Sequence, residues 1–252
     1  MSQTKQKVFK GFLVCIILGI FVVINLFPTM TLKKVECMED YAQDVTVNLN
    51  TYLGANIETK KALMITSSIS CDIVTLAMFI VWTVYGRSWR FPIAIVFVYL
   101  LKLITNALFK IRYPEGFLWE YPGFYSLTVP YGMSNNFHFT VHVALLLVIF
   151  QEFRSMKYFK TQLLTFVVLV TQSFLILCCR GAYSIDLFAA LIFGHFFWVL
   201  GNQLSYWIDV RVFGLTFQER FPEFQKECTN CRYPINKWTR NSVAELKAYR
   251  AD

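Results

Sequence analysis

Long apolar segments determine what this chain can fold into. A helix of about 20 predominantly apolar residues can cross the hydrocarbon core of a bilayer, which is about 30 Å thick. The chain is 56% hydrophobic and 17% aromatic, and its mean hydropathy is +0.47, which is outside the range of ordinary soluble domains. The apolar runs lie near Val8–Phe27, Ala62–Tyr85, Phe91–Phe109, Phe137–Phe153, Thr161–Cys179 and Ser184–Trp207. We therefore predict an all-α, polytopic membrane protein that folds as a six-transmembrane-helix bundle.

The distribution of Lys and Arg predicts how this bundle is oriented. Six spans place both ends of the chain on one side of the membrane, and that side carries 16 basic residues against 7 in the opposite loops. Cytoplasmic segments are enriched in Lys and Arg, so we expect an N-in/C-in orientation. The remaining basic residue, Lys102, lies inside a span, and we expect it to pair with Asp72, an intramembrane carboxylate. The net charge of +8 fits anionic lipid headgroups better than nucleic acid, because no basic-aromatic module accompanies it.

The chain divides into a predicted membrane domain, residues 1–207, and a polar C-terminal tail, residues 208–252. Two loops are expected on the side opposite the ends of the chain. Loop 29–61 should contain a short surface helix around Tyr41–Leu53. Loop 111–136 contains three Pro and three Gly, which break helices, and aromatic residues that suit the bilayer interface. We expect this second loop to lie over the mouth of the helix bundle.

Cysteine and histidine give little support for a metal site. Most of the seven cysteines lie in apolar spans, where cysteine behaves as a small hydrophobic residue. Cys228 and Cys231 form a C-x-x-C pair, for which a reduced or disulfide-linked pair is preferred over zinc because a structural zinc site usually has four ligands. His138 and His142 have the spacing of a metal-binding pair, but no third ligand accompanies them. We expect no metal and no other cofactor.

Two short segments carry the clearest chemical pattern. Residues 134–142 read SNNFHFTVH, and residues 180–186 read RGAYSID. Together with the aromatic loop before the first segment, they resemble the sphingomyelin synthase and phosphatidylcholine:diacylglycerol cholinephosphotransferase branch of the phosphatidic acid phosphatase type 2 superfamily. The typical forms in that branch are F-F-S-G-H-T and R-x-H-Y-T-x-D. The resemblance implies a six-helix membrane fold and a site for lipid headgroup transfer.

The resemblance also assigns a role to each matching residue. In that family, one histidine attacks phosphorus, an aspartate orients it from one helical turn away, and a second histidine protonates the leaving alkoxide. The leaving-group acid then falls on His142, the orienting carboxylate on Asp186 and the nucleophile position on Ala182. Arg180 matches an arginine that would hold phosphate oxygens. The remaining candidate residues for lipid or phosphate binding are His138, Arg112 and Tyr183.

The site departs from the family pattern at the residue that matters most. Alanine at position 182 has no nucleophilic atom, and loss of a covalent nucleophile costs about 10⁶ in rate in the best-dissected hydrolase triad. In addition, Val141 stands where the family has glycine, which would let the backbone approach a phosphate. His195 lies about 13 Å along its helix from Asp186, too far to share the same phosphate. We therefore expect no catalytic residue and a vestigial site.

The predicted function is that of a non-catalytic relative of lipid phosphotransferases. Such a protein would be a structural or lipid-binding subunit of a larger membrane complex, with membrane phospholipids and other membrane subunits as partners. The first expected location is the mitochondrial inner membrane. The alternative is an active transferase of phosphocholine-type headgroups that uses His142 and Asp186, in the endoplasmic reticulum or Golgi. A transporter or channel is a third class, supported only by Asp72, Lys102 and Asp186 as an intramembrane polar path.

Overall fold

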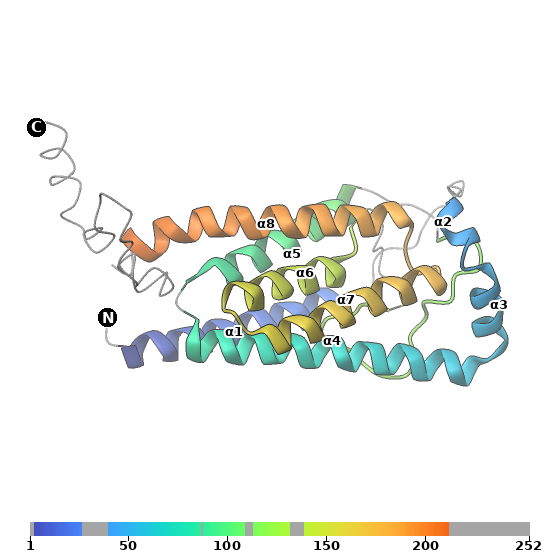
Figure 1. Ribbon diagram of the computed structural model, residues 1–252, viewed down its shortest axis with the longest axis horizontal. Helices are drawn as coiled ribbons and strands as arrows, with labels where there is room; N and C mark the ends of the chain where they lie inside the picture. The colour runs from blue at the N-terminus through green and yellow to red at the C-terminus, as the bar shows by residue number, and fades with distance from the viewer. Residues whose placement is uncertain (1–2, 27–39, 87, 109–112, 132–138, 212–252) are drawn as a thin grey trace, which may run out of the picture.

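The computed structural model describes residues 3–26, 40–86, 88–108, 113–131 and 139–211. The described elements are α1 (Gln3–Leu26), α2 (Tyr41–Asp44), α3 (Val47–Ala55), α4 (Ile57–Tyr85), α5 (Arg90–Leu108), α6 (Val141–Ser155), α7 (Phe159–Cys178) and α8 (Ser184–Arg211). No strand occurs in these ranges, which confirms the all-α prediction. The long helices run side by side along one axis, and α2 and α3 lie at one end of the bundle (Figure 1).

Four helices of the described part, α4, α5, α7 and α8, are long and apolar enough to cross a membrane. The protein is therefore an integral membrane protein. Helix α6 has 15 residues and is about 22 Å long, which is less than the thickness of a hydrocarbon core. The start of α1 and the end of α8 lie at the same end of the bundle, opposite α2 and α3 (Figure 1). The count of six spans and the N-in/C-in orientation stay predictions.

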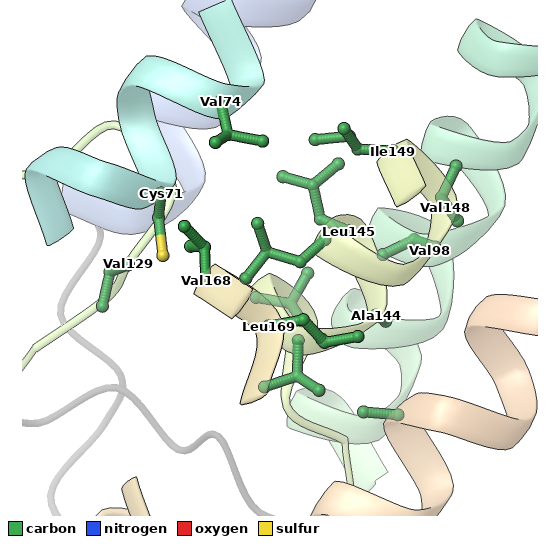
Figure 2. Close-up of a cluster of buried hydrophobic side chains, with 14 of the residues drawn as sticks. Cys71, Val74, Val98, Val129, Ala144, Leu145, Val148, Ile149, Val168 and Leu169 are labelled. Atoms are coloured by element: carbon green, nitrogen blue, oxygen red, sulfur yellow. The ribbon is translucent and has the colours of Figure 1, made fainter. Parts of the chain in front are cut away.

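Helix α6 is the central helix of the bundle. Its sequence is mostly apolar, as is typical of a helix that lies in a protein core or in a membrane. It packs against α4, α5, α7 and α8. Figure 2 shows Leu145 of α6 among side chains from neighbouring elements, including Val74 of α4 and Val168 of α7. The start of α6 is consequently held inside the protein.

The start of α6 differs from the predicted span at Phe137–Phe153. The helix begins at Val141, because Thr140 has an extended backbone with φ −81° and ψ 92°. His142 is therefore the second residue of the helix, whereas the predicted span placed it about two turns in. The predicted surface helix around Tyr41–Leu53 is present as the two short helices α2 and α3.

A buried ion pair joins α5, α6 and α8 at the end of the bundle where α8 ends. Arg90 Nε donates to Oε2 of Glu152 at 2.7 Å, and Arg90 Nη2 donates to Oε1 at 2.9 Å. The guanidinium carbon of Arg90 also lies 4.6 Å from the ring centre of Trp198, whose indole N–H donates to Glu152 at 3.1 Å. Both charges are thus paired and hydrogen-bonded, as buried charges must be. This cluster fixes the register of α5 relative to α6.

Candidate functional site

The turn between α7 and α8 carries the RGAYSID segment. It ends α7 with a Schellman motif, in which the N–H of Gly181 donates to the carbonyl of Ile176 at 2.9 Å and the N–H of Arg180 donates to that of Leu177 at 3.1 Å. Arg180 has φ 49° and so occupies the left-handed position that glycine usually takes. A side chain in this conformation costs about 1 kcal/mol. An arginine held here despite that cost is a reason to look for a role of its side chain.

The side chain of Arg180 reaches the aromatic loop. Its Nη1 donates to the backbone carbonyl of Glu115. Its Nε is buried and has no hydrogen-bond partner within the described part of the chain. Nη1 of Arg180 thus holds the loop, and Nε stays available to donate a hydrogen bond to a ligand.

The predicted nucleophile position is buried in apolar surroundings. Ala182 is 1% exposed and belongs to the hydrophobic core. Its carbonyl accepts a hydrogen bond from Nε2 of Gln43 at 3.2 Å, so α2 covers this turn. Gln43 could not be identified as a site residue from the sequence, because a single glutamine in a polar loop carries no recognisable pattern.

The carboxylate of Asp186 caps the start of its own helix. Its Oδ2 accepts from the backbone N–H of Tyr183 at 2.9 Å, in the manner of a capping box. Asp40 supports the same turn, because its two carboxylate oxygens accept from the N–H of Ser184 at 2.6 Å and from the hydroxyl of Ser184 at 2.9 Å. The geometry therefore gives Asp186 a structural role that does not need a catalytic histidine.

His142 is a buried histidine with unused hydrogen-bonding capacity. It is 1% exposed, and neither ring nitrogen has a hydrogen-bond partner among the described residues. The hydroxyl of Thr140, which immediately precedes α6, is buried and unpartnered in the same described part of the chain. Buried polar groups of this kind are rare in folded proteins and each calls for an explanation. A ligand that supplies the missing hydrogen bonds is one such explanation.

Trp119 of the aromatic loop brings the two motifs into one place. Its indole stacks on the imidazole of His142, with ring centroids 6.4 Å apart and planes at 3°. On the α7–α8 turn, a Cβ added to Gly181 would lie 2.7 Å from Cγ of Trp119. The side chain is 2% exposed and its N–H donates to the carbonyl of Pro130 at 3.0 Å. Trp119 therefore contacts both halves of the predicted site, and its role could not be read from the sequence.

The aromatic loop is fastened at its first half to the end of α7. The N–H of Leu118 donates to the carbonyl of Cys179 at 2.8 Å. Asn50 of α3 bridges the same two segments, because its Nδ2 donates to the carbonyl of Gly116 at 3.1 Å and to that of Cys178 at 2.8 Å. The loop thus lies against the end of the bundle that carries the two motifs.

The second half of the loop is held by Asp72. The carboxylate accepts from the hydroxyl of Ser126 at 2.9 Å, from the N–H of Leu127 at 3.0 Å, and from the N–H and hydroxyl of Thr128 at 3.0 and 2.7 Å. The predicted pairing of Asp72 with Lys102 stays a prediction. The loop supplies enough hydrogen bonds to satisfy the carboxylate without a cation.

Several predicted positions lie outside the described residues, namely His138, Arg112, Cys228, Cys231 and residues 212–252 of the predicted C-terminal tail, whose first four residues belong to α8. Within the described ranges, no group of three His, Cys, Asp or Glu residues could hold a metal ion. Tyr183 is buried beside Ala182, and both are 1% exposed. Of the predicted site residues that are described, Arg180, Tyr183 and Asp186 lie on one turn, and His142 meets that turn through Trp119.

The fold and these contacts define an integral membrane protein whose two lipid-transferase-like motifs meet at one end of a helical bundle. The chain belongs to the AtPDCT1/2 family, a phosphatidylcholine:diacylglycerol cholinephosphotransferase family, whose model matches residues 39–203. The match covers both motifs and the aromatic loop, so it places this chain in a lipid-modifying family of membrane proteins. Comparisons with curated proteins and with solved structures gave no match.

Proposed function

We propose that this protein is a non-catalytic member of its family that binds phospholipid and acts as a structural or lipid-binding subunit of a larger membrane complex. The observation that carries the proposal is Ala182, a residue with no nucleophilic atom, buried in the core where the family resemblance calls for histidine. Asp186, the carboxylate that would orient such a histidine, is bonded to the N–H of Tyr183 instead. The scaffold of the site is retained while its covalent chemistry is lost.

The proposal includes a membrane arrangement. We infer six spans, in which α1 and the short α6 join the four long apolar helices, and an N-in/C-in orientation. The basic residues at the ends of the chain support this orientation. The candidate site then faces the side opposite the cytoplasm or mitochondrial matrix. The mitochondrial inner membrane is the first location at which to look for the complex.

The direct test is a transfer assay on the purified protein in lipid nanodiscs. Labelled phosphatidylcholine and diacylglycerol are supplied together, and the products are separated by chromatography. We expect no transfer above the level of empty nanodiscs, and phospholipid should co-purify with the protein and be found by mass spectrometry. Product formation by the natural sequence that disappears in His142→Ala would overturn the proposal.

The complex is tested separately by blue-native electrophoresis of gently solubilised membranes. We expect the protein to migrate within an assembly much larger than 29.4 kDa. Migration only as a free monomer would remove the subunit part of the proposal and leave the lipid-binding part standing.

The second candidate function is an active headgroup transferase that uses His142 and Asp186. It is favoured by the unpartnered, buried imidazole of His142, which has the capacity to donate a proton to a leaving alkoxide. It requires another nucleophile, which the described part of the site does not provide at position 182. The transfer assay with and without His142→Ala decides between the two functions.

A further inference from the structure

Helix α8 carries a histidine on its outer face near the middle of the membrane. The span Ser184–Asp209 has 26 residues and is about 39 Å long, and His195 lies about 16 Å from its first residue and about 21 Å from its last. The residue is exposed on the surface of the bundle. Ionisable side chains at this depth almost always face the interior of a membrane protein or a water-filled cavity. A histidine that faces outward here therefore needs a specific reason.

His195 has one hydrogen-bonded neighbour, Gln151 of α6. The Nε2 amide group of Gln151 donates to Nδ1 of His195 at 3.0 Å. An amide N–H group can only donate, so Nδ1 is the acceptor and the proton of the neutral ring is on Nε2. Within the described part of the chain, this Nε2–H forms no hydrogen bond, and the buried Oε1 of Gln151 accepts none. The pair therefore leaves hydrogen-bonding groups unused at the depth of the hydrocarbon core.

Gln151 lies on the one strip of α6 that the neighbouring helices leave partly uncovered. Leu147, Phe150, Gln151 and Arg154 recur at helical spacing and are half-buried or exposed, whereas the positions between them and before them are buried. Helices α7 and α8 both pack against α6, and α6 lies between them (Figure 1). The hydrogen bond from Gln151 to His195 joins this strip to the outer face of α8.

The outer face of α8 around His195 is largely apolar. Ile192, Phe196 and Val199 are exposed and surround His195 at helical spacing, and Gln203 is exposed two turns further along the helix. Lipid chains are as apolar as these side chains, so burial of apolar surface alone does not favour a protein partner over lipid. A hydrogen bond to a polar side chain at this depth does, because lipid chains cannot supply it.

A second copy of this chain fits the face poorly. Membrane dimers with a two-fold axis along the membrane normal set identical residues opposite each other at the same depth. His195 would then meet His195 of the second copy, and each ring would present an N–H group to the other. Neither side supplies an acceptor. A different chain is the better match.

We propose that the outer face of α8 around His195, together with Gln151, docks a transmembrane helix of another protein that carries a hydrogen-bond acceptor at the same depth. The side-chain oxygen of Asn, Gln, Asp or Glu can accept from Nε2–H of His195. The inference rests on the proposed role as a subunit of a larger membrane complex, and it specifies the surface that meets the partner and the chemistry of the contact.

The match of donor and acceptor is tested with a model transmembrane peptide as the probe. The full chain, labelled with a donor fluorophore, is reconstituted into liposomes with a leucine-based helix that carries an acceptor fluorophore. The centre of this peptide holds either one Asn or only Leu. Energy transfer reports association within the bilayer. We expect the Asn peptide to associate at least threefold more tightly than the Leu peptide, because only Asn can accept from His195.

Variants at one position test the named contact. His195→Leu should remove the preference for the Asn peptide, whereas His195→Gln, which keeps an N–H donor, should retain part of it. Thr171→Leu is the matched control, because Thr171 is also an exposed polar residue of a span but its hydroxyl donates to the carbonyl of Val167 in its own helix at 2.9 Å. The control should leave the preference unchanged.

The same variants are compared in the native membrane by blue-native electrophoresis at rising detergent concentration. The comparison is made at the concentration that leaves half of the natural protein in its assembly. There, the fraction of His195→Leu that stays in the assembly should be at least threefold lower, and the fraction of Thr171→Leu should equal that of the natural sequence.

The outcomes separate this inference from the proposed function. Equal association of the Asn and Leu peptides, or a preference for Asn that persists in His195→Leu, would overturn the docking surface even if the protein belongs to a large assembly. Migration of the natural protein as a free monomer, with its preference for the Asn peptide intact, would remove the subunit role and leave the surface standing. Co-purification of two differently tagged copies that is lost in His195→Leu would identify a second copy as the occupant and overturn the choice of partner. Should His195→Leu fail to fold, the two peptides still decide on the natural sequence.

Discussion

The indole of Trp119 lies parallel to the imidazole of His142, with their ring centroids 6.4 Å apart. The same indole packs against Gly181 on the α7–α8 turn. A loop residue therefore occupies the space between the helix that carries the retained histidine and the turn that carries Ala182. In this protein the two motifs are joined by packing, and Trp119 is the contact that joins them.

Gly181→Ala should disturb this packing. The added Cβ would lie 2.7 Å from Cγ and 2.9 Å from Cβ of Trp119, and the rigid indole has little freedom to move away. Overpacking of this kind costs about 1–3 kcal/mol. We expect a lower melting temperature in detergent and altered tryptophan fluorescence.

The control for Gly181→Ala is Gly54→Ala on α3. Its added Cβ would meet Leu118 at 3.8 Å, an ordinary contact, and alanine is favoured over glycine in a helix by about 0.5–1 kcal/mol. This variant should be as stable as the natural sequence or more so. In a Trp119→Ala background the penalty of Gly181→Ala should vanish. A penalty that persists there would show that something other than the indole opposes the methyl group.

The sequence predicted the long helices well because each depends on a continuous apolar run, a local property. It failed at the start of α6, where Phe137–Thr140 is apolar enough to continue a helix although Thr140 is extended. It also missed the contacts of Asp72 with the aromatic loop, because every residue other than proline carries a backbone N–H group and residue type does not show which of them will donate to this carboxylate. The family resemblance located His142 and Asp186, but the contact of Trp119 with Gly181 depends on tertiary packing and could not be inferred from either segment alone.

Arg180 makes two opposing contributions to stability, the free-energy cost of its left-handed backbone and the stabilisation by its side chain. Arg180→Gly removes both, and a second position is needed to separate them. Glycine relieves the left-handed conformation at φ 49° but loses the hydrogen bond to the carbonyl of Glu115. Lys157 is a matched position, because it has φ 61° in the equivalent Schellman motif at the end of α6. We expect Lys157→Gly to stabilise the protein by about 1 kcal/mol.

The same change at Arg180 should give about 1–2 kcal/mol less stabilisation than at Lys157, because the loop contact is lost. The comparison is made by unfolding both variants in detergent under identical conditions. Equal effects at the two positions would mean that the guanidinium of Arg180 contributes no more to stability than the side chain of Lys157 does.

Asp72→Ala should release the second half of the aromatic loop. The change removes the carboxylate that accepts from the N–H groups of Leu127 and Thr128, and hydrogen bonds to a charged group contribute about 1.5–3 kcal/mol. We expect a lower melting temperature and faster hydrogen exchange at these two amides. Glu58→Ala is the control, because the Glu58 side chain is 93% exposed and its pairing with Lys61 is at the surface. Unchanged exchange at Leu127 and Thr128 in Asp72→Ala would contradict the proposed anchor.

The Arg90–Glu152 ion pair gives the last prediction, because it holds the start of α5 against the end of α6. Removing one partner leaves a buried charge, so Glu152→Leu should destabilise the protein by about 3–5 kcal/mol. Replacing both, as Arg90→Met with Glu152→Leu, should recover most of the loss, since apolar residues of similar volume can occupy such a site. The measurement is the melting temperature of the single and double variants in the same detergent. If the double variant is no more stable than Glu152→Leu alone, the pair does more than balance two charges.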